Sequence, residues 1–351
     1  GVQTVVEHVA VGLAELGHDI TIYGRQYYAK PMPQKYVYKN VNVINVKGIN
    51  SKRLDTLSHS FVASLMACFK NYDIVAYHSV VPAYFAVIPK LFGKKTVLHS
   101  HGLIENSSKW SKNDGYWANK LARISAFFID KVTTVSIAEV SKTSYLYSKR
   151  ATVIPNGIEY TRVERSAQPS NYILYVGRIV PGKGVELLVK AYNDFCQDNK
   201  LNEFELYIIG LPVHASEYYR SVLELSKMNN RIKWLGLIHG KELIEYYRHA
   251  YCVVIPSEYE SFGLTVLEAL EYNGCVLCSA IEQFKLLFSD YVLYFEKNNP
   301  SSLRIQLIRI LNEKDLRKKL VNKSIEFDFC KYSWDRVIQD YQKFYHSLLN
   351  K

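Results

Sequence analysis

Residues 172–192 read YILYVGRIVPGKGVELLVKAY, and this stretch sets the fold class of the chain. Apolar residues at 172–177 predict a strand, a glycine-containing loop carries Arg178 and Lys183, and apolar residues recur at helical spacing from Val185 to Phe195. A strand, a short loop and a helix in this order form the repeating unit of a parallel α/β sheet.

The same alternation extends in both directions from this stretch. Toward the carboxyl end the pattern predicts strands at 205–210, 232–235, 251–255 and 275–279 and helices at 216–228, 241–249 and 263–272. Toward the amino end it predicts helices at 2–16 (stopped by Gly17), 58–69 and 82–91 and strands at 19–23, 73–77, 95–100, 131–135 and 151–154. Two rounds of alternation, separated by the polar residues 162–170, predict two doubly wound domains joined near residues 160–170. A last helical stripe at 333–349 needs a surface to cover.

Composition narrows the class of protein. The chain has 351 residues, 48% hydrophobic and 22% charged, which excludes extensive disorder. No apolar run reaches the roughly 18 residues that a membrane span needs. The chain starts at Gly1 without a basic and apolar leader, so we expect a cytoplasmic protein with a shortened start.

The net charge of +11 suits nucleic acid, an anionic membrane or phosphorylated substrates. The basic residues are scattered and thicken only at Lys314–Lys323, which we interpret as a solvated helix face. The six cysteines are expected to be reduced core residues, because Cys275 and Cys278 lack a second pair to complete a zinc site.

Ligands of open α/β sheets bind beyond the carboxyl ends of the strands, and two such loops in the second half carry charges. In GRIVPGKG, Gly177 and Arg178 follow a strand and Lys183 precedes a helix, an arrangement that suits a diphosphate. The segment does not match a Walker loop, and by itself it is more simply explained as a turn with two surface cations.

The second loop contains ESFGLTVLE, residues 260–268. Glu260 is predicted to lie in the loop, Gly263 and Leu264 to offer free amides at a helix start, and Glu268 to lie more than a turn into the helix. Carboxylates accept hydrogen bonds from neighbouring hydroxyls, so the pair suits sugars on either side of a diphosphate. Each glutamate taken singly is more simply a surface charge.

Several motifs in order make the chain resemble the retaining glycosyltransferases of family 4, which have the GT-B fold. They are GVQTVVEHVAVGLAELGHDITIY, HSHG, VTTVS, VIPNGIE, YVGRIVPGKGVELLVKAY, IKWLGLI, PSEYESFGLTVLEALEYNG and YSWDRVIQDYQKFY. The segments LDTLSHSFVASLMAC and FGKKTVLHSHG look like a bacterial rhamnosyltransferase-type branch that builds surface polysaccharides.

This resemblance implies two Rossmann-like domains facing across a cleft. Residues 1–165 would form the acceptor-side domain, 166–332 the nucleotide-sugar domain, and 333–351 a helix crossing back to the first domain. The reaction would move a hexose or deoxyhexose from a nucleotide diphosphate sugar to a hydroxyl of a glycan or lipid-linked glycan with retention, without metal or cofactor. Peripheral contact with the inner membrane surface is also implied, and no nucleic-acid partner.

The resemblance assigns roles residue by residue. Glu260 would contact the donor sugar and Glu268 the ribose. Arg178 and Lys183 would bind the diphosphate, and His101 would lie beside the sugar; alternatively His101 is a packed strand-end imidazole. The remaining substrate contacts would be Gly1, Gly177, Ser261, Phe262, Gly263 and Leu264.

The chain also departs from the family pattern. It begins inside the loop that normally follows a first strand, so we expect that strand to be missing. Gly210-Leu211-Pro212 and Ala280-Ile281-Glu282 replace the family's glycine-rich segments near the donor. Three alternatives stay open: a nucleotide-sugar epimerase of the same fold, a truncated, non-catalytic nucleotide-sugar-binding module, and, third, a nucleic-acid-binding protein, which a lack of salt-sensitive binding would exclude.

Overall fold

The computed structural model describes residues 2–26, 33–51, 54–102, 112–147, 149, 151–160, 168–198, 203–212 and 217–350. The chain divides into two compact units. Unit 1 comprises Gly1–Glu159 together with Cys330–Lys351, and unit 2 comprises Tyr160–Phe329. The chain therefore passes from unit 1 into unit 2 once, and its last residues belong to unit 1 again.

The first strands of unit 1 form a three-stranded sheet in the order β1-β3-β2. β1 (Thr21–Arg25) pairs with β3 (Val41–Val46) in parallel, and β2 (Lys35–Tyr38) pairs with β3 as an antiparallel hairpin. Lys39 and Asn40 form the hairpin turn with φ of 46° and 63°. The sequence analysis missed this hairpin, because its turn lacks the glycine that usually signals one.

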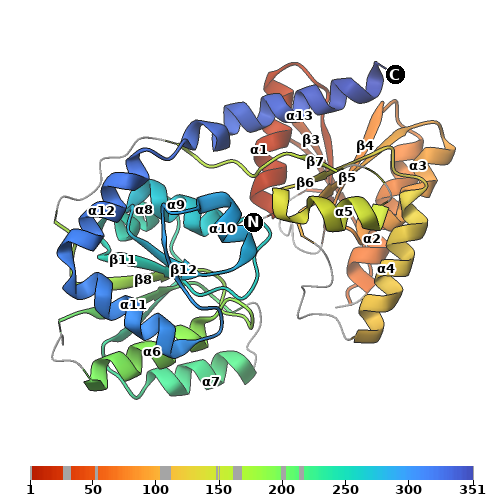
Figure 1. Ribbon diagram of the computed structural model, residues 1–351. Coiled ribbons are helices and arrows are strands. Elements are labelled where there is room, and N and C mark those ends of the chain that lie inside the picture. Colours follow the sequence, from red (N-terminus) through yellow and green to blue (C-terminus); the bar gives the residue numbers. More distant parts are fainter. Residues whose placement is uncertain are drawn as a thin grey trace. The chain divides into compact units, whose positions relative to one another are not determined.

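The other strands of unit 1 form a parallel sheet in the order β4-β5-β6-β7. These strands are β4 (Ile74–His78), β5 (Lys95–Ser100), β6 (Lys131–Thr134) and β7 (Thr152–Val153). They alternate with α2 (Leu54–Cys68), η1 (Pro82–Phe85), α3 (Val87–Leu91), α4 (Lys112–Ala126), η3 (Ile137–Glu139) and α5 (Val140–Tyr147) (Figure 1). The helix expected at 82–91 is split in two, because the ring of Pro89 conflicts with a helical carbonyl at Phe85, where η1 ends.

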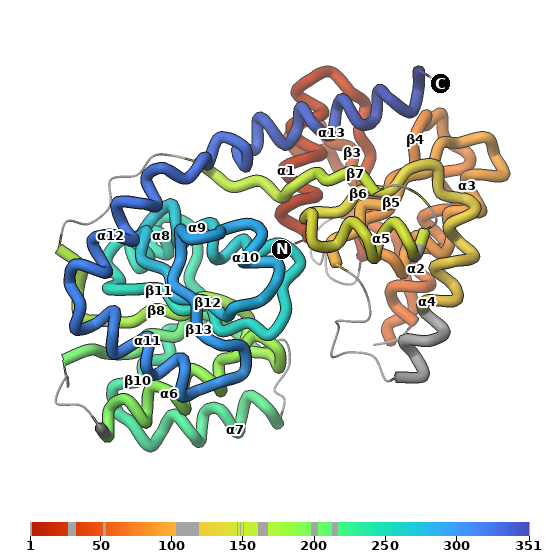
Figure 2. The backbone as a smooth tube through the Cα atoms, viewed as in Figure 1, coloured from red at the N-terminus to blue at the C-terminus, as the bar shows by residue number. Residues whose placement is uncertain are grey.

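Helix α13 (Trp334–Leu349) packs on α1 (Val2–Glu15), so residues from the two ends of the chain share one core (Figure 2). Ser333 caps α13 by accepting a hydrogen bond from the amide of Arg336. The common cluster consists of Val5, Val9, Leu13, Val97, Ile154, Val337, Tyr341, Phe344 and Leu348. The apolar stripe predicted at 333–349 therefore covers unit 1. The 3-10 helix η4 (Phe329–Tyr332) precedes α13.

Unit 2 contains a six-stranded parallel sheet in the order β10-β9-β8-β11-β12-β13. Its strands are β8 (Tyr172–Val176), β9 (Glu205–Ile209), β10 (Ile232–Gly236), β11 (Cys252–Ile255), β12 (Val276–Ser279) and β13 (Leu293–Phe295). Its helices are α6 (Val185–Asp198), α7 (Glu217–Ser226), α8 (Gly240–His249), α9 (Leu264–Tyr272), α10 (Glu282–Phe288), α11 (Pro300–Asn312) and α12 (Lys314–Ile325). The strand order reverses between β8 and β11, which is where ligands bind in doubly wound sheets.

The predicted α/β class is confirmed in both units, and the strands expected from the sequence pair in parallel. Helices α4, α5, α10, α11 and α12 and strand β13 were not predicted. The basic run near Lys318 lies on α12, and Lys314, Lys318 and Lys319 are exposed as expected.

All six cysteines are free thiols. Cys68, Cys252, Cys275 and Cys278 are buried as predicted, and burial raises the pKa of these four thiols. The prediction was wrong for Cys330, which is exposed because it lies in η4, where the chain returns to unit 1.

Candidate functional site

The loops after β8 and β11 meet in unit 2 because these two strands are neighbours. Cys252 pairs with Ile173 and Val253 with Leu174, so both strands end at the same edge of the sheet. The amide of Glu258 donates a hydrogen bond to the carbonyl of Gly182 at 2.9 Å. The two charged loops singled out in the sequence therefore form one structure.

Lys183 and Glu260, 77 positions apart, are joined by an ion pair between Nζ and Oε1. The same carboxylate oxygen accepts a hydrogen bond from the Ser257 hydroxyl at 2.9 Å. Ser257 is buried, and the side chains of Lys183 and Glu260 are only 23% and 16% exposed. Glu260 is therefore a fixed group in a polar cluster, not a freely solvated loop charge.

The loop after β8 carries Lys183, and we call it the lysine loop. It lies against the backbone of the loop after β11. Gly184 has a left-handed φ of +72°, and a Cβ there would lie 2.0 Å from the carbonyl oxygen of Pro256. Only glycine permits this approach. The close backbone contact holds Lys183 near Glu260.

Helix α9 begins beside this cluster. Gly263 is its N-cap with a φ of +99°, and a Cβ there would lie 2.7 Å from Cε1 of the fully buried Phe284. Glycine has no capping side chain, so the first amides of α9, including that of Leu264, need a partner from outside the helix. A helix end of this kind attracts anions.

Glu268, on the first turns of α9, is half-buried and accepts a hydrogen bond from the Tyr247 hydroxyl at 3.0 Å. Tyr247 is buried on α8. Burial raises the pKa of Glu268 above its ordinary value, and the hydrogen bond from Tyr247 opposes part of that rise. Tyr247 thus fixes one oxygen of the carboxylate, which leaves the other for a ligand.

The remaining predicted residues of unit 2 lie in the same loops. Arg178 is exposed, and its carbonyl accepts a hydrogen bond from the Tyr175 hydroxyl at 3.1 Å. Gly177 and Ser261 are half-buried. The ring of Phe262 is buried, so only its backbone is available for a substrate contact.

In unit 1, His101 follows β5 and stacks on His78, with ring centroids 5.3 Å apart. His78 Nδ1 and His101 Nε2 are hydrogen-bonded at 3.0 Å. Nδ1 of His101 is buried and has no hydrogen-bond partner among the described residues. Burial lowers the pKa of His101 to about 4, so its imidazole is neutral at neutral pH. His101 is thus a partly satisfied imidazole with one ring nitrogen available. Gly1 lies outside the described residues.

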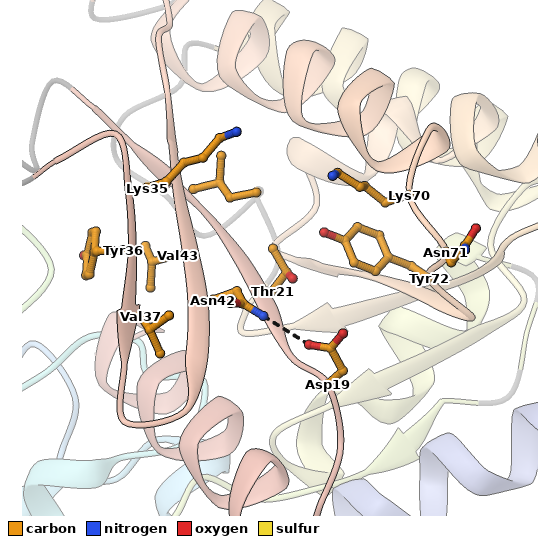
Figure 3. A pocket seen from close by; sticks show the side chains of 11 residues that line it. Asp19, Thr21, Lys35, Tyr36, Val37, Asn42, Val43, Lys70, Asn71 and Tyr72 are labelled. Atoms are coloured by element: carbon orange, nitrogen blue, oxygen red, sulfur yellow. Dashed lines mark hydrogen bonds between the residues drawn. The ribbon is translucent and has the colours of Figure 1, made fainter.

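A cavity of about 550 Å³ in unit 1 contains none of the predicted site residues. Lys35 and Lys70 extend into its upper part, and Asn42 donates a hydrogen bond to Asp19 at 3.1 Å (Figure 3). It is lined by residues of β1, β2 and β3 and by Lys70, Asn71 and Tyr72, which precede β4. It therefore lies near the amino end of β4, whereas His78 is the last residue of that strand.

A second cavity, of about 480 Å³, adjoins the lysine loop of unit 2. It is lined in part by Gly182, Gly184, Tyr218, Glu258 and Asn298. Among the described residues, no group of three or more His, Cys, Asp or Glu side chains could hold a metal ion. None of the described helices has both the length and the apolar character to span a membrane.

Two family models match the chain, one for each half. Residues 158–327 match the glycosyl transferases group 1, and residues 1–162 match glycosyltransferase family 4. Both halves of the chain are glycosyltransferase domains. The predicted glycosyltransferase class is thereby confirmed.

Individual proteins agree with this assignment. An uncharacterized glycosyltransferase of Methanocaldococcus jannaschii is 26% identical over 323 residues, covering 89% of this chain and 86% of its own. The lipopolysaccharide 1,2-N-acetylglucosaminetransferase of Salmonella typhimurium is 22% identical over 292 residues, covering 77% and 72%. Anabaena HepE, solved with UDP and glucose, has a TM-score of 0.79 at 15% identity and covers 99% and 96%. The glycosyltransferase therefore has the GT-B fold.

Sequence analysis missed three residues that shape these sites. The sequence contained a usable signal for Ser257 and His78, since each is a polar residue at or just beyond the end of a strand. Tyr247 had none, because its contact with Glu268 depends on how α8 packs against α9.

Proposed function

We propose that the glycosyltransferase moves a hexose or deoxyhexose from a nucleotide diphosphate sugar to a hydroxyl with retention of anomeric configuration. The observation that carries this proposal is the meeting of Lys183 with Glu260, in loops that adjoin the α9 amino end. Cations and free amides suit the diphosphate, and fixed carboxylates suit the sugars on either side of it.

The residues of unit 2 contact different parts of the donor in this proposal. Lys183, Arg178 and the amides of Gly263 and Leu264 bind the diphosphate. Glu268 accepts hydrogen bonds from the ribose, and Glu260 accepts them from the donor sugar. The backbones of Gly177, Ser261 and Phe262 line the same loops. In unit 1, we assign the neutral imidazole of His101 to the reacting sugar, and a contact from Gly1 stays a prediction.

The ion pair gives donor binding a defined order of events. Without donor, Lys183 and Glu260 neutralise each other. An arriving diphosphate competes with Glu260 for Lys183, and its success releases the carboxylate for the sugar hydroxyls. The anion thus prepares the sugar site.

Bond cleavage leaves negative charge on the nucleoside diphosphate, and the cations and helix end stabilise that charge. The departing phosphate oxygen takes the proton of the acceptor hydroxyl as the new bond forms on the same face. This scheme uses protein charges in place of a metal ion, so chelation with EDTA should leave turnover unchanged.

The acceptor we propose is a glycan or lipid-linked glycan of a cell-surface polysaccharide. The lipopolysaccharide transferase of Salmonella supports this class, and HepE with UDP and glucose supports a nucleotide donor. The rhamnosyltransferase-type motifs favour a deoxyhexose.

The first test is turnover by Lys183→Ala and Glu268→Gln, with Lys241→Ala and Glu242→Gln as matched controls at exposed positions of α8. We expect each site variant to lose at least roughly 100-fold in kcat/KM, because it removes a charge used in donor binding or in the transition state. The controls should stay near wild type.

Thermal shift separates loss of function from loss of fold. A nucleoside diphosphate at about 100 times its Kd should stabilise the wild type by about 2.7 kcal/mol. Because burial raises the Glu268 pKa, the charged carboxylate costs stability at neutral pH, so Glu268→Gln should keep its Tm without ligand but lose the shift. Near-wild-type transfer by either site variant would contradict the proposed site.

A further inference from the structure

His78 is a titratable side chain that the proposed reaction does not use, although it touches one that the reaction does use. It ends β4 and is paired in register with His99 of β5, two positions before His101. The centroid of the His78 ring lies 4.9 Å from that of His99 and 5.3 Å from that of His101. His78 therefore contacts both histidines of the neighbouring segment.

The backbone turns sharply directly after His78 and directly after His101. Ser79 has a φ of 109° and Gly102 a φ of 132°. An L-residue such as Ser79 is strained in this region of φ, and such strain persists where the surrounding structure holds it, often at functional sites. The amide of Ser79 donates a hydrogen bond to the carbonyl of His99 at 3.0 Å. The end of β4 is thus fixed against β5 at the position of His78.

His99 is fixed by contacts of its own. Its Nδ1 lies 2.7 Å from Oγ1 of Thr133, and its Nε2 lies 2.6 Å from Oη of Tyr345. Both ring nitrogens of His99 are therefore occupied. His78 instead forms its hydrogen bond with His101, between Nδ1 of His78 and Nε2 of His101 at 3.0 Å.

This hydrogen bond sets the proton position on His101. Burial keeps both imidazoles neutral, since it lowers the pKa of His78 to about 3 and that of His101 to about 4. A neutral imidazole carries one N–H, so one ring donates and the other accepts. If Nε2 of His101 donates, its Nδ1 is a bare acceptor, and if His78 donates, Nδ1 of His101 carries the proton. His78 therefore determines what His101 can offer a ligand.

The surroundings of His101 favour the arrangement in which its Nε2 donates. Its Nδ1 is buried and has no hydrogen-bond partner among the described residues. Among buried backbone groups, an N–H without an acceptor is rarer than a carbonyl short of donors, and we apply the same preference to the ring. A bare Nδ1 can accept a hydrogen bond from a sugar hydroxyl when the donor binds.

We propose that His78 is a positioning residue, which accepts a hydrogen bond from Nε2 of His101 and so holds Nδ1 of His101 as an acceptor for a hydroxyl of the donor sugar. The two rings also stack with 16° between their planes, which fixes the direction in which Nδ1 points. This inference rests on the contact between His101 and the sugar proposed above, and it adds the group that orients that contact.

The first measurement uses the full chain with isotope-labelled histidine and needs no substrate. Two-bond proton–nitrogen correlation spectra at neutral pH show which ring nitrogen carries the proton, and the signals lost in His101→Gln assign His101. We expect a single tautomer of His101 with its proton on Nε2. His78→Phe keeps a ring but cannot form the hydrogen bond, so His101 should become a mixture of both tautomers.

His78→Asn and His78→Gln form a matched pair that differs by one methylene group. Asparagine places its amide oxygen near the position of Nδ1, where it can accept from His101, whereas glutamine places it near that of Nε2. We expect asparagine to restore the single tautomer and glutamine not to do so. His239→Phe, at an exposed position of unit 2, should leave the His101 signals unchanged.

Turnover gives the second measurement. We expect His78→Phe to lower kcat at least about tenfold and to change the KM for the donor less than about twofold, because the misaligned contact acts mainly in the transition state. His78→Asn should keep kcat within about threefold of the wild type. The Tm of each variant is measured alongside, and the comparison of asparagine with glutamine stands by itself if His78→Phe does not fold.

Three results would overturn the proposal. They are a proton on Nδ1 of His101 in the wild type, unchanged His101 signals in His78→Phe, and equal effects of His78→Asn and His78→Gln. Full turnover by His101→Gln would overturn the sugar contact on which the inference rests. The spectra need no substrate, so they distinguish that failure from a failure of His78 to set the tautomer.

Discussion

At the scale of single residues, three histidines near the ends of β4 and β5 are held neutral by burial. Burial lowers the pKa of His78 to about 3 and that of His101 to about 4, and it holds the pKa of His99 well below its ordinary value. His99 is hydrogen-bonded to Thr133 at 2.7 Å and to Tyr345 at 2.6 Å. His101 adds to the cost of protonating His78, and His78 and His101 both add to the cost of protonating His99.

This arrangement predicts that unit 1 loses stability in acid. The folded pKa values lie below the unfolded value of about 6.5, so the unfolded state binds more protons than the native state below that pH. Stability is complete above about pH 6.5 and falls by up to about 1.4 kcal/mol per pH unit for each histidine as pH drops toward 4. Denaturant unfolding across this range measures the loss.

A variant assigns the acid sensitivity to the cluster. His99→Gln keeps a polar group near Thr133 and Tyr345 but cannot be protonated, so its stability should fall less steeply with pH than that of the wild type. The exposed His239, which lies outside the cluster, supplies the matched control variant His239→Gln. Equal slopes for wild type and His99→Gln would contradict this account.

At the scale of elements, the amino end of α9 depends on a glycine that packing makes irreplaceable. Gly263 combines a left-handed φ with close approach to the buried ring of Phe284. Gly182 has a similar φ of +84° but no atom within 4 Å of a Cβ placed there. Alanine in place of Gly182 therefore introduces backbone strain alone, whereas alanine in place of Gly263 adds a steric conflict with Phe284.

We predict that Gly182→Ala lowers the free energy of unfolding by about 1–2 kcal/mol, because an L-residue is strained in the left-handed region. Gly263→Ala should cost roughly 3 kcal/mol or more, because the methyl group also displaces Phe284. It should also weaken nucleoside diphosphate binding, since α9 supplies amides to that site. Denaturant unfolding and thermal shift measure both effects, and equal costs for the two variants would show that φ strain alone matters.

At the scale of the whole molecule, the chain closes unit 1 with its last helix. Trp334 stacks on His8 of α1 with ring centroids 4.3 Å apart, and a Cβ on Gly157 would meet the Trp334 ring at 2.4 Å. Tyr341 is buried in the cluster shared with Val5 and Val9. Unit 1 therefore needs residues that follow unit 2 in the chain.

Tyr341→Ala should destabilise unit 1 by about 3–5 kcal/mol through the cavity it leaves. The exposed Lys343→Ala on the same helix should stay within about 0.5 kcal/mol of the wild type. Hydrogen exchange resolved by peptide should show faster exchange in Val2–Glu15 and unchanged exchange in the β8–β13 sheet. Loss of protection in unit 2 instead would mean that the two units do not unfold separately.

The sequence determined on its own the α/β class, most strands and helices, and which loops carry charge. These features are local: apolar periodicity reports which face of an element is buried, and glycine and proline report where it ends. The motif order also identified the glycosyltransferase class, later confirmed by both family models.

Only the tertiary structure decided which of these residues act together. The pairing of Lys183 with Glu260 follows from β8 lying beside β11, and that of Tyr247 with Glu268 from the packing of α8 on α9. The ring contact between Phe69 and Phe92 likewise arises because α2 and α3 end side by side. Periodicity shows that an element has a buried face, but the partner of that face depends on strand order and helix packing, which bring together residues far apart in the chain.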